Sequence, residues 1–279
     1  MTGVDGSRTW IDNACAIAQP DGIMPDTNAM PPLIDHPSPN HGPRLGGPPD
    51  MLLLHYTGMR DAAGALARLC DPKAEVSAHY MVDEAGTIFR LVAEDRRAWH
   101  AGRAFWRGER DINSRSIGIE LVNPGHEWGY RPFPDAQMAA LMALARDIQS
   151  RYAIDPMRVL GHSDVAPGRK QDPGELFDWK ALADAGIGIW PHPHLDDFLP
   201  PGVGEIQALL DRLGYETTPA GDAHGILWDE KAEMALKAFQ RHWCPTSVDK
   251  GVDNMSVAAL RALIRQESAR TVAFGGPDA

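Results

Sequence analysis

The stretch Met51-Leu52-Leu53-Leu54-His55 is a continuous apolar run that ends on a histidine. Apolar residues at consecutive positions are typical of a strand that is buried on both faces, as in a sheet covered by helices. A second apolar run, SIGIELV over residues 116–122, carries Glu120, and a third, RVLG over residues 158–161, leads into His162. The three runs predict buried strands, two ending at a histidine and one carrying a glutamate.

The segments between these runs have other periods. Residues 61–70 (DAAGALARLC) are typical of a short helix, and residues 135–152 place apolar side chains at helical spacing after Pro134. Residues 79–92 predict a β-hairpin whose turn contains Gly86. Strands mixed with helices indicate an α/β fold, with helices layered on a sheet.

Breaks rich in proline and glycine divide the 279 residues into five parts. We expect residues 1–47 to form an extended Pro-rich arm, because proline fixes φ and removes a backbone donor. Residues 48–190 form the α/β domain, and residues 191–203, within WPHPHLDDFLPPGVG, a linker. Residues 204–267 predict a small domain of three helices, and residues 268–279 a frayed tail.

Composition excludes several classes of protein. The chain has 27 basic and 38 acidic residues, so its net charge of −11 disfavours binding to nucleic acid. No apolar stretch reaches the ~18 residues of a membrane span. Cys15, Cys70 and Cys244 form no C-x-x-C pair, which excludes a thiolate zinc knuckle and favours three free thiols.

The amino-terminal residues bear on location. They contain no cationic start followed by an apolar core, so no signal peptide is visible. We therefore expect a cytoplasmic protein. The alternative is the periplasm or cell envelope, since a chain trimmed of its leader would look the same.

His55 and His162 follow predicted strands, and Asp172 lies ten residues after His162 in a loop rich in proline and glycine. Two imidazoles and a carboxylate, with a fourth position left for water, are the ligand set of a catalytic zinc site. Such a metal lowers the pKa of its water to about 7 and polarises a carbonyl. Spacing alone favours three structural residues over a metal site, because a histidine at a strand end is more often structural than a ligand.

Other polar residues have two readings each. Glu120 in an apolar strand is costly to bury, which suits a general acid or base, or else a glutamate paired with arginine or facing outward. Lys170 suits an oxyanion-stabilising cation or a solvated surface lysine. Trp99 and His100 suit a sugar or peptide groove, or core packing. The motifs G-x-S-x-G, H-E-x-x-H, P-loop and G-x-G-x-x-G are absent, against serine hydrolases, zincins and nucleotide-binding proteins.

Five segments occur in one order: LLLHYTGM, SAHYMVDEAGTIFRLV, RRAWHAG, NSRSIGIELVNPG and GHSDVAPGRKQDPG. Together they resemble the type-2 N-acetylmuramoyl-L-alanine amidase family, which shares its fold with peptidoglycan recognition proteins. The resemblance covers roughly residues 48–190 and is greatest to the AmiD-like and AmpD-like bacterial members with a carboxy-terminal extension. It implies a mixed central β-sheet flanked by helices.

The resemblance also implies roles for residues that match the family's motifs. One Zn²⁺ per chain would be held by His55, His162 and Asp172, with Glu120 and Lys170 catalytic. The enzyme would cut the amide between the lactyl group of N-acetylmuramic acid, or its 1,6-anhydro form, and L-alanine of the stem peptide. Residues that would bind the peptidoglycan or muropeptide substrate are Tyr56, Arg97, Trp99, His100 and Asn113.

Residues 203–265 resemble a peptidoglycan-binding domain of type 1, through Ile206-Gln207, Leu210, Gly214-Tyr215, Phe239-Gln240 and Gly251. Two other functions are compatible with the sequence: a recognition protein that binds peptidoglycan without cutting it, and a zinc amidase for an unrelated amide. The complete set of metal ligands favours the enzyme over the binding protein. The sequence leaves open the oligomeric state, and whether the enzyme recycles soluble muropeptides or trims the wall.

Overall fold

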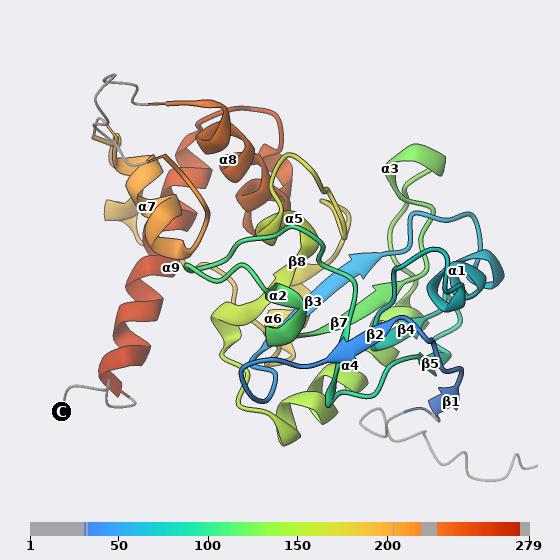
Figure 1. Cartoon of the computed structure of the whole chain (residues 1–279). Coiled ribbons are helices and arrows are strands. Elements are labelled where there is room, and N and C mark those ends of the chain that lie inside the picture. The colour runs from blue at the N-terminus through green and yellow to red at the C-terminus, as the bar shows by residue number, and fades with distance from the viewer. Residues whose placement is uncertain (1–30, 32, 203, 219–227, 274–279) are drawn as a thin grey trace, which may run out of the picture.

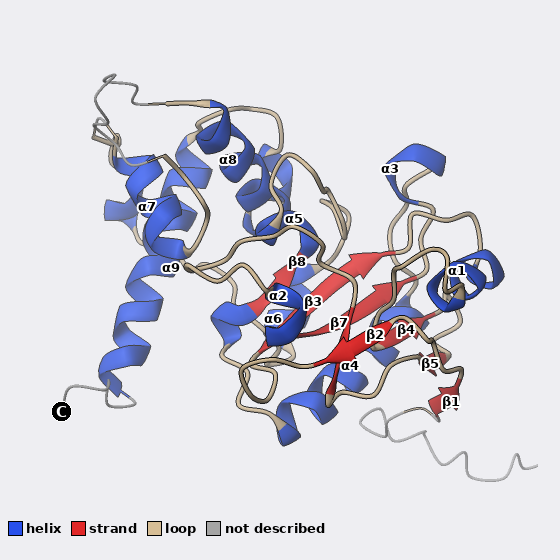
Figure 2. Cartoon of the chain, in the orientation of Figure 1, coloured by secondary structure: helices blue, strands red, loops and turns tan. Residues whose placement is uncertain are grey.

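The computed structural model describes residues 31, 33–202, 204–218 and 228–273. Figure 1 shows a central sheet with helix α4 against one face and the carboxy-terminal helices grouped at one side, next to α5 and β8, and Figure 2 separates helices from strands by colour. The strands are β1 (Leu33–Asp35), β2 (His41–Pro43), β3 (Met51–Tyr56), β4 (Tyr80–Val82), β5 (Ile88–Arg90), β6 (Arg96–Ala98), β7 (Ser116–Leu121) and β8 (Val159–Gly161). The helices are α1 (Ala62–Cys70), α2 (Ile112–Arg115), α3 (Gly125–Trp128), α4 (Asp135–Arg151), α5 (His162–Val165), α6 (Trp179–Asp184), α7 (Glu205–Leu213), α8 (Glu230–Trp243) and α9 (Asn254–Ala273). Short 3₁₀ turns are η1 (Pro156–Arg158), η2 (Leu195–Phe198) and η3 (Pro245–Ser247).

The main sheet is mixed, as predicted. Its strand order is β1-β5-β4-β7-β3-β8, and β3 runs parallel to both β7 and β8. Strands β4 and β5 are antiparallel and form the predicted hairpin. Gly86 in its turn has φ +85°, and a Cβ there would lie 2.7 Å from the backbone oxygen of Ala136 on α4. The turn therefore requires glycine for both conformation and space.

The alternation of side chains along β3 sets the two faces of the sheet. Leu52 and Leu54 pack with Leu141 and Leu144 of α4 in one cluster. Met51 and Leu53 point the other way and belong to a second cluster. His55 continues this second series, so the strand aims its histidine at the face opposite α4.

The second cluster is shared with the carboxy-terminal helices. It joins Met51, Leu53 and Leu160 of the sheet to Leu236 and Phe239 of α8. The three predicted helices are confirmed, but α8 lies directly against α5 beside the sheet (Figure 1). The apolar core on the His55 side of the sheet thus includes residues far along the chain.

The predicted linker is packed rather than free. Within residues 191–202, Asp197 is buried and accepts hydrogen bonds of 2.6 Å from Arg265 on α9. Arg261 Nη1 donates to Leu199 O at 2.6 Å, and His192 N donates to Gln266 Oε1 at 2.9 Å. These bonds fix the segment along α9, which explains why its prolines do not produce a flexible tether.

The frayed tail predicted from residue 268 is wrong for residues 268–273, because α9 continues to Ala273. Arg212 Nη2 donates to Ser268 Oγ at 2.9 Å, and Arg270 lies 3.7 Å from Asp155 of the α/β unit. These polar contacts extend the helix where the apolar pattern ends. Residues 274–279 lie outside the described residues.

Part of the amino-terminal arm is extended, as expected. Strand β1 pairs with β5 in parallel, and β2 pairs with β6 in a separate antiparallel ribbon. Ser38 lies between β1 and β2, and its Oγ donates to Leu69 O at 2.5 Å. This bond links the segment between the two strands to α1. Residues 1–30 and 32 of the arm, with Cys15, lie outside the described residues.

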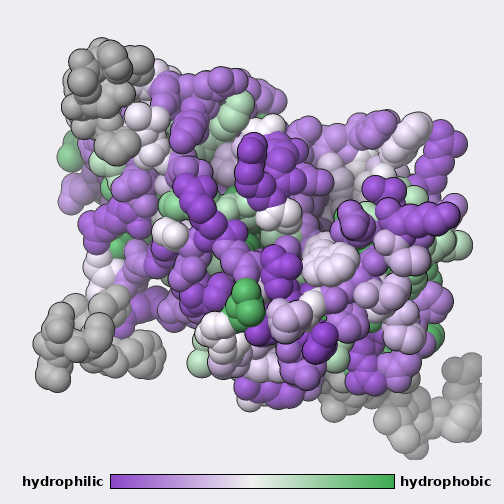
Figure 3. Space-filling model, in the orientation of Figure 1, coloured by the Kyte–Doolittle hydropathy of each residue, from purple (hydrophilic) through white to green (hydrophobic). Residues whose placement is uncertain are grey.

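The face seen in Figure 3 is mostly hydrophilic, and apolar side chains appear on it only as small separate patches. Within the described parts of the chain, no helix combines the length and apolar character needed to cross a membrane. Cys70 and Cys244 are free thiols, as expected.

Candidate metal centre

Three neighbouring strands bring the candidate residues together. His55 and Glu120 are register partners on the parallel strands β3 and β7, so both side chains leave the same face of the sheet. His162 follows β8, the strand on the other side of β3. Because parallel strands end at one edge, three side chains distant in sequence meet there.

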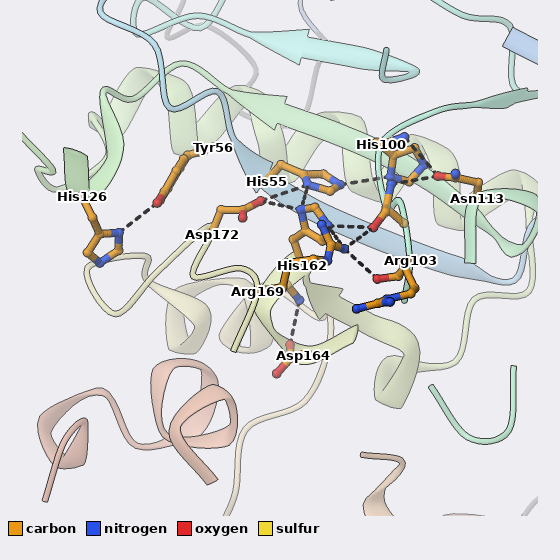
Figure 4. A network of polar contacts seen from close by, with 12 residues as sticks. His55, Tyr56, His100, Arg103, Asn113, His126, His162, Asp164, Arg169 and Asp172 are labelled. Atoms are coloured by element: carbon orange, nitrogen blue, oxygen red, sulfur yellow. Dashed lines mark hydrogen bonds and ion pairs between the residues drawn. The ribbon is translucent and has the colours of Figure 1, made fainter. Parts of the chain in front are cut away.

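His55, His162 and Asp172 point their ligand atoms at one another (Figure 4). His55 Nδ1 lies 3.0 Å from His162 Nδ1, and Asp172 Oδ2 lies 3.0 Å from each of these nitrogens. In a tetrahedral zinc site with ligand distances of about 2.0–2.1 Å, neighbouring ligand atoms are about 3.3 Å apart. The triangle therefore has nearly the size that zinc requires.

The hydrogen bonds made by Nε2 of His55 and His162 determine which tautomer each ring adopts, and therefore whether Nδ1 carries a lone pair. His162 Nε2–H donates to Ala101 O at 3.0 Å, which leaves a lone pair on Nδ1 of the neutral ring. His55 Nε2 lies 3.0 Å from His100 Nδ1, and His100 Nε2 lies 3.4 Å from Ser116 Oγ. If Nε2 carries the proton in both His55 and His100, each donates to the next residue in this chain of contacts. The two Nδ1 atoms and Asp172 Oδ2 then present only lone pairs to one another, and a cation between them would stabilise this arrangement.

Glycine makes room for this support. A Cβ on Gly118 of β7 would lie 2.5 Å from His100 Nδ1, so any side chain there would displace the His100 ring. Gly118 N–H also donates to His79 Nδ1 at 2.9 Å. The glycine of the S-I-G-I-E segment is therefore explained by two imidazoles packed against the strand.

Burial and charge set the proton affinities. Burial lowers the pKa of His55 to about 4, and the neighbouring His162 acts in the same direction. Burial alone would raise the pKa of Asp172, but the two imidazoles outweigh it and hold that pKa below its ordinary value. A neutral His55 beside an ionised carboxylate is the protonation state that a metal ion needs.

Glu120 has the opposite shift. Burial raises its pKa well above the ordinary value, the charge of Asp172 adds to the rise, and Lys170 opposes it. Its Oε2 atom is buried and has no hydrogen-bond partner among the described residues. The alternative of a glutamate paired with arginine therefore does not hold, because no such pair is found there.

A cleft of about 490 Å³ lies over the triangle. Its walls include the catalytic candidates Glu120 and Lys170, together with Tyr56, Trp99 and His100. Arg97 and Asn113 are not among its lining residues: Arg97 bonds Asp111 at 2.8 Å, and Asn113 Oδ1 accepts from the backbone of His100 and Ala101. Asn113 therefore supports the backbone at His100 in the cleft wall, whereas the Arg97 side chain is paired with Asp111.

His126 lies behind the cleft-lining residue Tyr56 and was not singled out from the sequence. Tyr56 Oη lies 2.9 Å from His126 Nδ1, and His126 Nε2 lies 3.2 Å from Glu175 Oε1. His126 belongs to α3, whose sequence GHEW has no strand or helix period to mark it. The only sequence signal for His126 was its position shortly after the apolar strand β7, next to Glu127.

Comparisons with known proteins agree with this geometry. The sequence profile of the family described as N-acetylmuramoyl-L-alanine amidase matches residues 45–175. Escherichia coli N-acetylmuramoyl-L-alanine amidase AmiD is 37% identical over 236 residues, which cover 77% of this chain and 82% of AmiD. The chain belongs to the N-acetylmuramoyl-L-alanine amidase family.

Solved amidases share its fold. The complex of E. coli AmiD with the substrate anhydro-N-acetylmuramic acid-L-Ala-D-γ-Glu-L-Lys superimposes with a TM-score of 0.67 at 36% identity, covering 80% of this chain and 91% of AmiD. AmpDh3 from Pseudomonas aeruginosa, in complex with anhydromuramic pentapeptide, gives a TM-score of 0.68 at 32% identity, covering 80% of this chain and 93% of AmpDh3. The likeness to these amidases extends beyond the α/β unit, which ends near residue 190.

Proposed function

We propose that this amidase uses one zinc ion to hydrolyse the amide between the lactyl group of N-acetylmuramic acid and L-alanine of the stem peptide. The observation that carries the proposal is the triangle of lone pairs at 3.0 Å from His55, His162 and Asp172, beneath a cleft that also exposes Glu120. A zinc ion held there would polarise the amide carbonyl and increase the acidity of a water molecule.

Glu120 is the general base in this proposal. Its strand places it beside His55, and its buried Oε2 has no competing partner among the described residues. It would take a proton from the attacking water and pass it to the leaving amine of L-alanine. Its raised pKa favours this second role, because the shift makes it easier for the carboxyl group to hold the proton before passing it on.

Lys170 would stabilise the oxyanion. It lines the cleft two residues before Asp172, and its charge acts on both Glu120 and His55. A cation near the scissile carbonyl interacts more strongly with the developing negative charge than with the neutral amide. This difference lowers the barrier without tightening the binding of the ground state.

The proposed substrate contacts come from the cleft walls. Tyr56, Trp99 and His100 line it, and Trp99 offers an aromatic surface against the sugar or peptide. We assign Asn113 to supporting the wall at His100 and Arg97 to its pair with Asp111, which revises the role inferred from resemblance. Within the cleft, Tyr56 is oriented by His126.

We propose a soluble 1,6-anhydro-muropeptide as the substrate. Anhydro-muramyl peptides are the ligands named for the AmiD and AmpDh3 complexes. The proposed compartment is the cytoplasm, where an enzyme of this kind would recycle soluble muropeptides. A preference for intact sacculi would instead place the enzyme in the cell envelope, with the carboxy-terminal helices as a wall-binding unit.

The test is to incubate the purified protein with 1,6-anhydro-MurNAc-tripeptide and, separately, with intact sacculi, and to identify products by mass spectrometry. Each reaction is repeated after zinc is removed with a chelator and again after zinc is restored. We expect free peptide from the soluble substrate, loss of release with the chelator and recovery with zinc. Absence of release from both substrates at one zinc per chain would refute the proposed reaction.

A further inference from the structure

Asp164 is a fully buried carboxylate two residues after His162. It accepts three hydrogen bonds, from Gly161 N–H at 2.8 Å, Tyr215 Oη–H at 2.6 Å and His242 Nδ1–H at 2.7 Å. The first donor is local, whereas Tyr215 and His242 belong to the carboxy-terminal helical part. The carboxylate therefore joins this part to the segment that carries a proposed metal ligand.

Both distant donors are held rigidly. The His242 ring is stacked between Trp179 and Trp243, with centroid distances of 3.7 Å on each side. Tyr215 is fully buried and meets Trp106 edge to face at 5.0 Å. Since the rings cannot turn freely, their donors stay aimed at Asp164.

These donors are needed, because no lysine or arginine is paired with Asp164 in the described part of the chain. A buried carboxylate without charge compensation is tolerated only when its lone pairs are hydrogen-bonded. Losing one donor leaves a lone pair unsatisfied or moves the carboxylate toward another partner. Either change shifts the backbone that holds it.

That backbone is the single turn of α5, which begins at His162. Val165, at its other end, packs in the cluster shared with α8, and Ser163 N–H donates to Asp172 O at 2.9 Å. The turn thus connects both His162 and Asp172 to the carboxy-terminal helices. Displacement of α5 by a few tenths of an ångström would open the triangle of ligand atoms.

We propose that Tyr215 and His242 are positioning residues for the metal centre, acting through Asp164. The carboxy-terminal helices are then part of the support of the zinc site, in addition to any role in binding the wall. The inference rests on the proposed zinc ligands His162 and Asp172. It predicts that these helices affect metal affinity even when no polymeric substrate is present.

The test measures zinc affinity of the full-length chain by competition with a chromogenic chelator, without substrate. Tyr215→Phe deletes one hydroxyl, and we expect zinc binding to weaken about tenfold, the lower range for partners that orient metal ligands. His242→Phe keeps a stacked ring without the donor and should act similarly. His242→Asn, which places an amide donor near the position of Nδ1, should restore part of the affinity.

Gln266→Ala is the matched control. It loses an interface hydrogen bond, from Gln266 Nε2 to Trp190 O at 3.1 Å, but it contacts neither Asp164 nor the stacked His242 ring. We expect it to lower the melting temperature and leave zinc affinity within twofold of the parent. Affinities within twofold for both Tyr215→Phe and His242→Phe would overturn the inference. A parent that binds no zinc would instead overturn the proposed function itself.

Discussion

Alternate residues of the same strands have different roles on the two faces of the central sheet. Toward α4, Leu52, Leu54 and Ile117 meet an almost wholly apolar helix surface. Toward the opposite side, His55 and Glu120 occupy the intervening positions beside buried imidazoles. One face contributes burial of apolar area, and the other holds polar groups at a cost that their mutual contacts offset.

The comparison explains why the reactive residues are held so firmly. A ligand such as His55 is fixed by a strand whose neighbouring side chains are locked in the α4 cluster. The same residue would be less constrained on a loop, because loops lack this packing. Changes on the polar face should therefore affect chemistry first, and changes on the apolar face should affect stability first.

The largest effect is expected from the metal ligands. His162→Ala removes one atom of the triangle, so we expect loss of bound zinc and no measurable peptide release. Zinc content by atomic emission and product formation by mass spectrometry check this. The chelated parent should behave in the same way, and turnover by either sample would separate the triangle from catalysis.

Glu120→Gln keeps the size of the side chain but cannot accept the proton. We expect kcat to fall by about 10²–10⁴, the usual contribution of a general base, with zinc content unchanged. Steady-state kinetics of the zinc-loaded variant measure this. A kcat within threefold of the parent would remove Glu120 from the proton transfer.

The contrast between the faces also shows what the sequence could predict. The buried strands, the hairpin, α4 and the three carboxy-terminal helices followed from local periodicity, and five separate segments in one order pointed to the site through their resemblance to a known family. Periodicity cannot detect a contact such as His242 with Asp164, which joins residues 78 positions apart. It also cannot show that Asp197 is held by Arg265, so a packed segment resembled a free linker.

Among site residues, the prediction was best where chemistry demanded one side chain at a strand end. His55 and His162 belong to this group. Arg97 and Asn113 lie in motif segments as well, but their side chains turn toward Asp111 and the backbone of residues 100–101. Motif membership marks the neighbourhood of the cleft, whereas the direction of a side chain depends on partners that only the fold brings near.

On the apolar face, Leu141→Ala should lower the free energy of unfolding by about 2–5 kcal/mol, because a fully buried side chain leaves a cavity. Zinc affinity and kcat, measured well below the melting transition, should remain within twofold of the parent. Chemical denaturation and chelator competition provide the two readings. A tenfold loss of zinc affinity without unfolding would show that the two faces are not independent.

A smaller effect distinguishes the faces by pH. Burial and the charge of Arg44 lower the pKa of His79 to about 3, below the ordinary value of 6.5. Between these values the unfolded chain binds a proton that the folded chain does not, so stability falls as pH falls. From pH 7 to pH 5 the loss is about 2 kcal/mol for this residue.

The measurement compares urea unfolding of the metal-free parent and His79→Asn at pH 7 and pH 5. Asparagine can still accept the Gly118 N–H bond but does not titrate, so the variant should lose less stability on acidification than the parent. Leu141→Ala, although less stable at both values, should keep the parent's pH dependence. Equal pH dependence in all three proteins would mean that the pKa of His79 is the same in the folded and unfolded chain, so that burial beside Arg44 does not hold the imidazole neutral.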